Sequence, residues 1–174
     1  DCTPDDVIMV HLYLRDMADF TLMNGIYRDF FGVFLPPSRS TVGVQTDRIR
    51  LDCQVLCGSG DYLRSRGTNP YTKSARLATD AVLRSVLHLQ SRSHWAPVCV
   101  GPYSQANTIR NLHFLAGQIG LIPSTMTLRP SWNEQLEQCW TNVAKVLDAL
   151  SGSLDNVMSC LLYVSDSVYC SDVL

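Results

Sequence analysis

Two long apolar runs, near the two ends of the chain, share one pattern. Residues 7–16 and 157–166 are rich in β-branched and aromatic residues and end in a polar turn, so each is predicted to be a buried strand. Val, Leu, Tyr and Asp recur at identical offsets in the two runs. Such a repeat indicates two related modules, and we expect each to be cut short by a chain terminus.

Two further segments have apolar residues at helical spacing. The first, over residues 16–34, opens with an aspartate that can cap a helix. The second, over residues 131–150, opens with Ser131 and Glu134 in the pattern of a capping box, where each side chain accepts from the other residue's amide. A glycine stands near the end of each stripe, where helices commonly stop. The pattern therefore predicts two amphipathic helices.

Shorter runs predict the remaining strands. Residues 41–44 and 48–55 follow the first helix, and the second of these runs alternates apolar and polar residues. That alternation is typical of a sheet with one packed face. Residues 86–90 favour another strand, and residues 108–115 favour a hairpin that turns at Arg110-Asn111.

The middle of the chain has a different composition. Residues 57–72 contain several glycine, serine and arginine residues and are predicted to be a linker or a long loop, and residues 73–85 a short helix. We therefore divide the chain into half-modules over 1–56 and 86–174, joined by a linker over 57–85. Because each helix has one apolar side, we expect an α+β fold, with a mixed sheet and helices packed on one of its faces.

Composition narrows the class of protein. The 174 residues carry a net charge of −2, which gives no general attraction to nucleic acid or to anionic lipid. No apolar run approaches the ~20 residues that a membrane helix needs, and no secretory signal is visible. The seven cysteines are scattered without a C-x-x-C pair, so we expect reduced thiols in a cytoplasmic protein and no metal site. The chain begins with Asp1, so we expect a fragment or a processed form.

Several short motifs together resemble the RidA (YjgF, endoribonuclease L-PSP-like) family of small trimeric imine deaminases. The matching features are the Gly-Pro-Tyr at 101–103, the Ala-Gly-Gln at 116–118, the helix 131–150 and strand 157–165, and in the other half strand 7–15, Asn24, Arg39 and strands 41–45 and 48–55. The resemblance covers residues 5–55 and 95–166. It implies a RidA-like, chorismate-mutase-like fold that forms trimers.

A narrower resemblance is carried by residues 87–105. The sequence from Leu87 to Gln105 is similar to the junction between the tandem C-terminal RidA-like modules of eukaryotic diphthine–ammonia ligases. Those enzymes use ATP to amidate diphthine on elongation factor 2. No Ser-Gly-Gly-Lys-Asp-Ser-like phosphate loop occurs here, so we expect no cofactor in this segment, with ATP bound by the parent ligase.

The resemblance implies a site for a small carboxylate ligand. Arg39, in a Pro-Pro-Ser-Arg-Ser turn, would hold the carboxylate through a two-pronged contact, and the alternative is a solvated turn residue. Tyr103 would line the pocket or simply pack, and Asn24 would donate an amide hydrogen bond or bond the backbone. Gly117, between Ala116 and Gln118, would expose backbone N–H groups or form a β-bulge.

One position departs from the family pattern. The deaminases place a glutamate on the last strand to orient water and move protons, and Arg50 stands at that position here. An arginine stays protonated and cannot act as a general base, and Asp52 lies about 7 Å further along the strand. Gly43 also replaces an acidic residue of the preceding strand. These changes favour a module retained for binding or assembly.

Three functions remain open from the sequence. In the first, the chain is an accessory part of a diphthine–ammonia ligase, with elongation factor 2 as a partner through the parent enzyme. In the second, it is a deaminase that converts 2-imino acids to 2-keto acids and ammonia. In the third, it is a non-catalytic scaffold or ligand-binding homotrimer. We also expect residues 7–55 and 95–166 to fold as one permuted unit, with strands 48–55 and 112–118 in the same sheet within a chain or between chains. One copy of the repeated strand is then surplus or pairs between chains.

Overall fold

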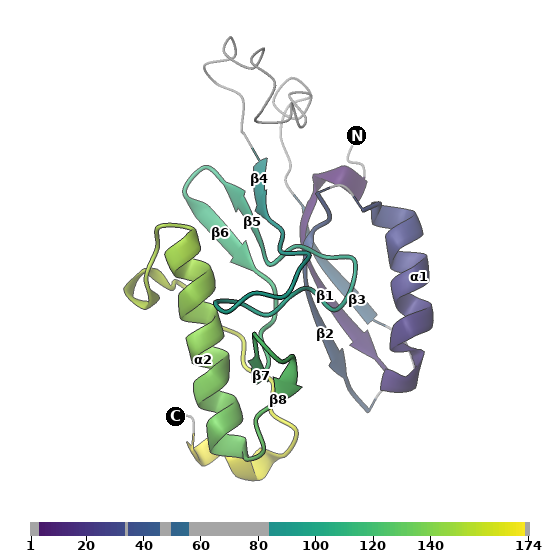
Figure 1. The fold of residues 1–174 in the computed structure, drawn as a ribbon. Helices are drawn as coiled ribbons and strands as arrows, with labels where there is room; N and C mark the ends of the chain where they lie inside the picture. The colour runs from purple at the N-terminus through teal and green to yellow at the C-terminus, as the bar shows by residue number, and fades with distance from the viewer. Residues whose placement is uncertain (1–3, 34, 46–49, 56–83, 173–174) are drawn as a thin grey trace.

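The computed structural model of the chain describes residues 4–33, 35–45, 50–55 and 84–172. Figure 1 shows one helix and a sheet on one side of the molecule, and a second sheet, a short ribbon and a second helix on the other. Most strands follow one another along the chain and pair within sheets, and each of the two described α-helices packs beside these strands, so the predicted α+β class is confirmed.

The first sheet has the N-terminal copy of the repeat at its centre. Its strand order is β2 (Ser38–Gly43), β1 (Val7–Leu14), β3 (Arg50–Val55), with β2 parallel and β3 antiparallel to β1. Val10 pairs with Arg39 on one side and with Cys53 on the other. A central strand is covered on both edges, which suits the apolar run of β1.

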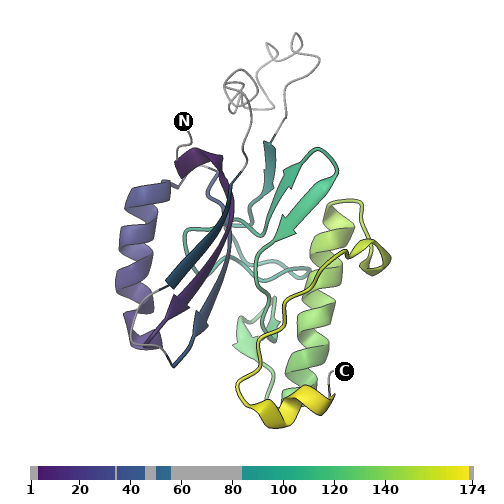
Figure 2. The ribbon, with the colours of Figure 1, turned by 180° about the vertical axis from the view of Figure 1, so that it is seen from behind.

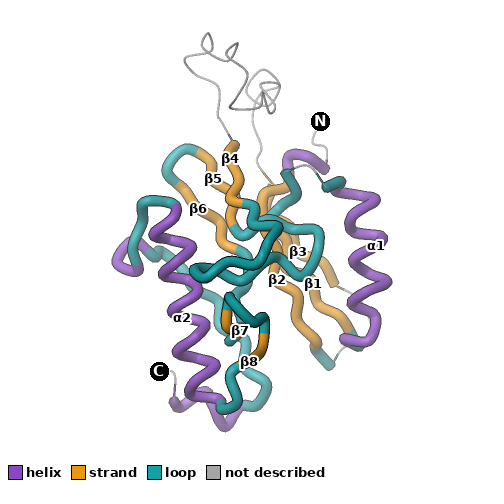
Figure 3. Tube along the Cα trace, in the orientation of Figure 1, coloured by secondary structure: helices purple, strands orange, loops and turns teal. Residues whose placement is uncertain are grey.

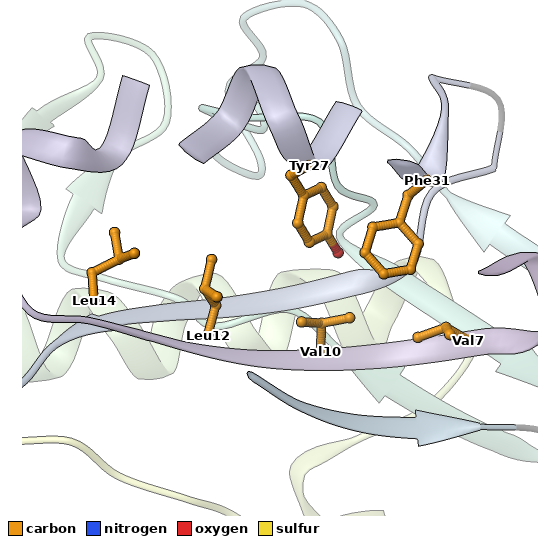
Figure 4. Packing of buried hydrophobic residues seen from close by; sticks show 6 residues of the cluster. All are labelled: Val7, Val10, Leu12, Leu14, Tyr27 and Phe31. Atoms are coloured by element: carbon orange, nitrogen blue, oxygen red, sulfur yellow. The ribbon is translucent and has the colours of Figure 1, made fainter. Parts of the chain in front are cut away.

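Helix α1 (Phe20–Phe31) covers one face of this sheet. Figure 4 shows side chains of β1 pointing towards the helix, where they meet Tyr27 and Phe31. Asp16 accepts a hydrogen bond from the amide of Ala18 at 2.8 Å and caps a single 3₁₀ turn before the helix. Gly32 ends the helix with a φ of 74°, a conformation that glycine adopts at little cost.

The second sheet is antiparallel, in the order β4 (Arg84–Leu87), β5 (Ala106–Ile109), β6 (Leu112–Leu115). The predicted hairpin is confirmed, because Ile109 pairs with Leu112 across a turn in which Arg110 has a φ of 54°. The strand predicted over 86–90 begins earlier and ends earlier than expected. The predicted linker 57–72 and most of the predicted helix 73–85 lie outside the described residues.

Helix α2 (Trp132–Ala149) packs against the ribbon of β7 (Leu121–Ile122) and β8 (Thr127–Leu128). The predicted capping box is present: Ser131 Oγ accepts from the Glu134 amide at 3.4 Å, and the Glu134 carboxylate accepts from the Ser131 amide at 3.1 Å. The helix thus begins where the sequence predicts.

The strand predicted over 157–165 is absent, which corrects the expectation drawn from the repeat. This segment is extended but belongs to no strand, and Met158 is 86% exposed. Figure 2 shows it as the yellow segment running alongside α2. The place between β2 and β3 that a strand of this sequence suits is already filled by β1.

The two halves meet at the beginning of β2. Ser38 forms an isolated bridge with Ser104, and the Gly117 amide donates to the Arg39 carbonyl at 3.1 Å. Figure 3 shows the long loop between β4 and β5, residues 88–105, reaching across to the first sheet. Strands β3 and β6 nevertheless belong to different sheets within the described residues, so the expected shared sheet does not form within one chain. Its formation between chains stays a prediction.

Candidate functional site

Arg39 is the second residue of β2, and the predicted turn at this position is therefore a strand. Its register partner is Val10, which belongs to the apolar cluster under α1, so the arginine side chain extends to the same face. The residue is 2% exposed. The reading of Arg39 as a solvated turn residue is wrong for this structure.

Three aromatic rings surround the guanidinium. Its Cζ atom lies 4.6 Å from the ring centroid of Tyr27, 5.0 Å from that of Tyr103 and 5.6 Å from that of Phe20. Nη1 also approaches the Met23 sulfur at 3.8 Å. The negative faces of the rings stabilise the cation, by up to about 2 kcal/mol per desolvated pair. We call Arg39, these three rings and the neighbouring Asn24 the arginine cage.

Two polar atoms in the cage lack a partner. Arg39 Nη2 and Asn24 Oδ1 are buried and form no hydrogen bond with the described residues, and no described carboxylate pairs with Arg39. Gly101 lies between them: a Cβ there would come within 2.6 Å of Nη2 and 2.9 Å of Oδ1. A larger residue here would require Arg39 or Asn24 to shift. A buried cation without an anionic partner is costly, so the cage has unused capacity for an anion.

Two ionisable groups near Arg39, Tyr103 and Cys99, are neutral at physiological pH. Burial raises the pKa of Tyr103 to about 12, with a smaller contribution from the nearby Cys99 thiol. Burial likewise raises the pKa of Cys99 to about 12, although Arg39 opposes the shift. Burial lowers the pKa of Arg39, yet a guanidinium remains protonated in proteins. The arginine is therefore the charged member of this cluster.

The predicted site residues fall into two groups. Arg39, Asn24 and Tyr103 come together in the cage, as the motifs predicted. The 116–118 motif instead reaches the backbone of β2, because the Gly117 amide bonds the Arg39 carbonyl. A Cβ on Gly117 would lie 2.5 Å from Ser40 Oγ, so close packing accounts for this glycine.

The remaining two members of that motif bond within the second half. The Ala116 amide donates to the Gln105 carbonyl at 2.7 Å, and Gln118 Nε2 donates to the Ala116 carbonyl at 3.3 Å. Neither of these two contacts reaches β2. The binding roles assigned to these residues from the sequence stay predictions.

Sequence reasoning missed part of the cage. The helical spacing of apolar residues correctly predicts that Phe20, Met23 and Tyr27 lie on the packed side of the first helix. Their contact with Arg39 depends on how α1 crosses β2, which periodicity does not give. Cys99 and Gly101 lie in the β4–β5 loop, and the sequence around them did not predict that either residue lies close to Arg39.

The candidate acid–base positions lie away from the cage. Asp52 pairs with His11 and Arg50 with Tyr13, whereas Arg39 pairs with Val10. Since successive residues of a strand face opposite sides, Asp52 lies on the face of the sheet that α1 does not cover. Burial raises the pKa of Tyr163 on that face, with smaller contributions from Tyr13 and from the Asp52 charge. Asp52 is therefore not placed to act as a base on a ligand held by Arg39.

The described residues contain no cluster of three or more His, Cys, Asp or Glu side chains suited to a metal ion. None of the helices in the described ranges is long and apolar enough to span a bilayer.

Comparison with known proteins gives related sequences over most of the chain. Residues 93–173 match the model of the family Endoribonuclease L-PSP. Diphthine–ammonia ligase of Schizosaccharomyces pombe is 34% identical over 170 residues, which are 93% of this chain and 23% of that protein. The ligase of Saccharomyces cerevisiae is 29% identical over 169 residues, 92% of this chain and 23% of the protein. The chain thus spans under a quarter of the length of either ligase.

Shorter matches come from deaminases. The chloroplastic Reactive Intermediate Deaminase A of Arabidopsis thaliana is 30% identical over 115 residues, 66% of this chain and 59% of that protein. The crystal structure of RidA from Psychrobacter sp. PAMC 21119 shares 40% identity over 36% of this chain and 51% of that one, with a TM-score of 0.35. The resemblance to RidA proteins and to diphthine–ammonia ligases predicted from the sequence is confirmed.

Proposed function

We propose that this chain, a RidA-related segment, is an accessory module of a diphthine–ammonia ligase that binds a small anionic ligand at Arg39. Two ligases align with more than nine-tenths of it, which supports this assignment over that of a free-standing deaminase. In this proposal the ligase chemistry and the ATP site belong to the rest of the parent enzyme. Contact with elongation factor 2 and assembly as a cytoplasmic homotrimer are further parts of the same proposal.

The observation that carries the binding function is the unpaired Nη2 of Arg39 beside Asn24 Oδ1. A carboxylate can accept two parallel hydrogen bonds from one guanidinium, and such charge-assisted bonds are about twice as strong as neutral ones. The adjacent Asn24 amide adds a second polar contact, which favours a ligand that carries a hydrogen-bonding group next to its carboxylate. The aromatic rings would exclude water from the contact.

Ligand entry requires the β4–β5 loop to move. Arg39 is 2% exposed, and Gly101 and Tyr103 of this loop lie against its guanidinium. An anion therefore reaches Nη2 when this part of the loop swings away. Binding would then be linked to the position of the segment that joins the two halves.

A binding experiment tests this role with pyruvate as the probe. At ten times its dissociation constant, a bound ligand stabilises the folded state by about 1.4 kcal/mol, which raises Tm by about 3–5 °C in a protein of this size. The Arg39→Met variant should lose the shift, because the side chain keeps its length and loses its charge. Lys145→Met, which removes an exposed cation, is the matched control. An equal shift in Arg39→Met, or none in the parent chain, argues against the site.

A second assay addresses deaminase chemistry, which the shorter relatives suggest. The rate of pyruvate release from enzymatically generated 2-aminoacrylate is measured with and without the chain. We expect little or no acceleration, since no described carboxylate pairs with Arg39 and Asp52 lies on the opposite face of the sheet. Acceleration that disappears in Arg39→Met would instead assign deaminase activity to this site.

The accessory role is tested in the yeast ligase. The 169-residue region of the Saccharomyces cerevisiae enzyme that matches this chain is replaced by the chain itself. Diphthamide on elongation factor 2 is then measured by mass spectrometry. We expect amidation by the chimaera and a marked loss with Arg39→Met, whereas full amidation after deletion of the whole region would exclude the role.

A further inference from the structure

The turn that leads into β2, residues 35–37, has an unusual backbone conformation. Leu35 has a φ of 54°, in the left-handed region that residues other than glycine rarely adopt. Pro36 follows it, and a residue that precedes a proline is further restricted towards extended conformations. A strained conformation of this kind persists only where surrounding contacts hold it. The chain therefore needs a support at Leu35, four residues before Arg39.

The second half of the chain supplies that support. Arg84 Nη2, in β4, donates to the Leu35 carbonyl at 3.0 Å. Ser104 Oγ donates to the Pro36 carbonyl at 2.8 Å, and the Ser104 amide donates to the Pro37 carbonyl at 3.2 Å. Three consecutive carbonyls of the turn are thus bonded by residues that lie far away in the sequence.

Asn107 joins these contacts and depends on Arg84 for its orientation. It is fully buried in β5, and its Oδ1 accepts from Arg84 Nε at 2.6 Å. Its Nδ2 therefore faces the turn, where it donates to Ser38 Oγ at 2.9 Å and to the Pro36 carbonyl at 3.3 Å. Without Arg84, either end of the amide could face the turn, because an amide oxygen and an amide nitrogen are similar in size. Arg84 thus fixes both the turn and the side chain that supports it.

Arg39 follows directly after these contacts. Its carbonyl accepts from the Gly117 amide at 3.1 Å, so the backbone on both sides of its side chain is bonded to the second half. Its guanidinium lies between rings on two other elements, Tyr27 of α1 and Tyr103 of the β4–β5 loop. Where β2 begins therefore decides how the charge sits between the rings. A displacement of about 1 Å is enough to impair a binding site.

We propose that Arg84 is a positioning residue for the Arg39 site, which sets the place of the Arg39 guanidinium by holding the turn 35–37. Arg84 touches no ligand and acts through Leu35 and Asn107. Its planar guanidinium reaches two acceptors at once, a geometry that the single ammonium group of lysine does not reproduce. The inference rests on the proposed function, in which a small carboxylate binds at Arg39.

Arg84→Lys tests the inference with a readout that needs no ligand. The Gly117 amide reports the contact with Arg39, whereas the Ala116 amide, bonded at 2.7 Å to a carbonyl of its own half, reports the fold of that half alone. Hydrogen exchange at both amides is measured by NMR on the full chain. We expect Arg84→Lys to speed exchange at Gly117 by about tenfold and to leave Ala116 within about twofold of the parent chain. Arg92→Lys, at an exposed arginine of the β4–β5 loop, should change neither.

Ligand binding gives the second readout. The dissociation constant for pyruvate is measured by calorimetry, and Arg84→Lys should raise it by about tenfold, because the charge is kept while Arg39 is displaced. Leu35→Gly in the Arg84→Lys background should restore most of the affinity, since glycine adopts a positive φ at little cost. Val33→Gly in the same background, at an exposed residue just before the turn, is the matched control and should restore none.

The two readouts separate this inference from the proposed function. If pyruvate does not bind the parent chain, the proposed function fails, and exchange at Gly117 relative to Ala116 still decides whether Arg84 positions Arg39. The inference is overturned if Arg84→Lys leaves exchange at Gly117 unchanged, or speeds exchange at Ala116 equally, since Arg84 then acts on general stability alone. It is also overturned if pyruvate binds Arg84→Lys as tightly as the parent chain, or if Val33→Gly restores affinity as well as Leu35→Gly does.

Discussion

The two α-helices of the described residues are held in place by different chemistry. Helix α1 meets β1 through apolar side chains, with Val10, Leu12 and Leu14 against Tyr27 and Phe31. Helix α2 also buries apolar side chains, but polar groups fill part of its packed face. They form one series of hydrogen bonds, from Arg129 to Gln138, from Gln138 to Asn142, and from Asn142 to the carbonyls of Ile119 and Leu121.

The difference has a physical consequence. Apolar packing under α1 is non-directional and loses stability in proportion to the surface and volume removed. The series under α2 is directional, because each amide fixes the position of its partner, and one missing group leaves several buried atoms unsatisfied. Removing buried methyl groups is therefore expected to destabilise the packing under α1 in proportion to the cavity left behind. Removing one amide is expected to destabilise the packing under α2 by breaking several hydrogen bonds at once.

The largest expected loss of stability comes from disrupting the apolar cluster under α1. Leu14→Ala removes buried methyl groups at a fully enclosed position of the first cluster. The lost transfer free energy and the cavity together should lower the free energy of unfolding by about 3 kcal/mol. Denaturant unfolding measures this, with Leu22→Ala on the exposed side of α1 as the control, expected within about 0.5 kcal/mol of the parent chain. A loss below about 1 kcal/mol would mean that the cluster is loosely packed.

The second prediction concerns the series of hydrogen bonds under α2. Asn142→Ala leaves the Ile119 and Leu121 carbonyls and the Gln138 amide without their partner. We expect a loss of about 2 kcal/mol, because buried groups keep their desolvation cost when a bond is lost. Asn133→Ala, at an exposed asparagine of the same helix, is the matched control. If both variants unfold at the same denaturant concentration, the buried series contributes nothing specific to α2.

Features set by short stretches of sequence were predictable. The capping box at Ser131, the glycine stop of the first helix and the hairpin at Arg110 each depend on neighbouring residues, and each is confirmed. The segment 157–165 carries the same local signal as β1 yet forms no strand. A strand exists only through its partners, and here the first copy occupies the place between them.

The candidate site was predictable to a similar degree. The motifs predicted that Arg39, Asn24 and Tyr103 belong to one site, and the structure places all three in one cluster. The rings of Phe20 and Tyr27 join them only because α1 crosses β2 at that point. That crossing is a tertiary feature, and helical periodicity assigns these residues to the core without saying what else they contact.

Tyr103 lies in the loop between the two sheets, and ionisation of its phenol reports how tightly that loop is packed. Its pKa is raised from 10 to about 12 by burial. Above pH 10 the unfolded chain loses this proton while the folded chain keeps it, so the unfolded state binds fewer protons and stability falls as pH rises. Relative to Tyr103→Phe, the parent chain should lose about 1 kcal/mol between pH 10 and 11. Parallel pH profiles for the two would show that the phenol is solvated.

The smallest effect compares how the two helices begin. Helix α2 begins with the Ser131–Glu134 capping box, whereas the residue before α1, Asp19, makes no capping hydrogen bond with its side chain. Ser131→Ala should therefore lower the free energy of unfolding by about 0.5–1 kcal/mol, and Asp19→Ala by only a few tenths. Thermal unfolding of the two variants under identical conditions measures the difference. Equal shifts would mean that α2, despite its polar packed face, depends on its cap no more than α1 does.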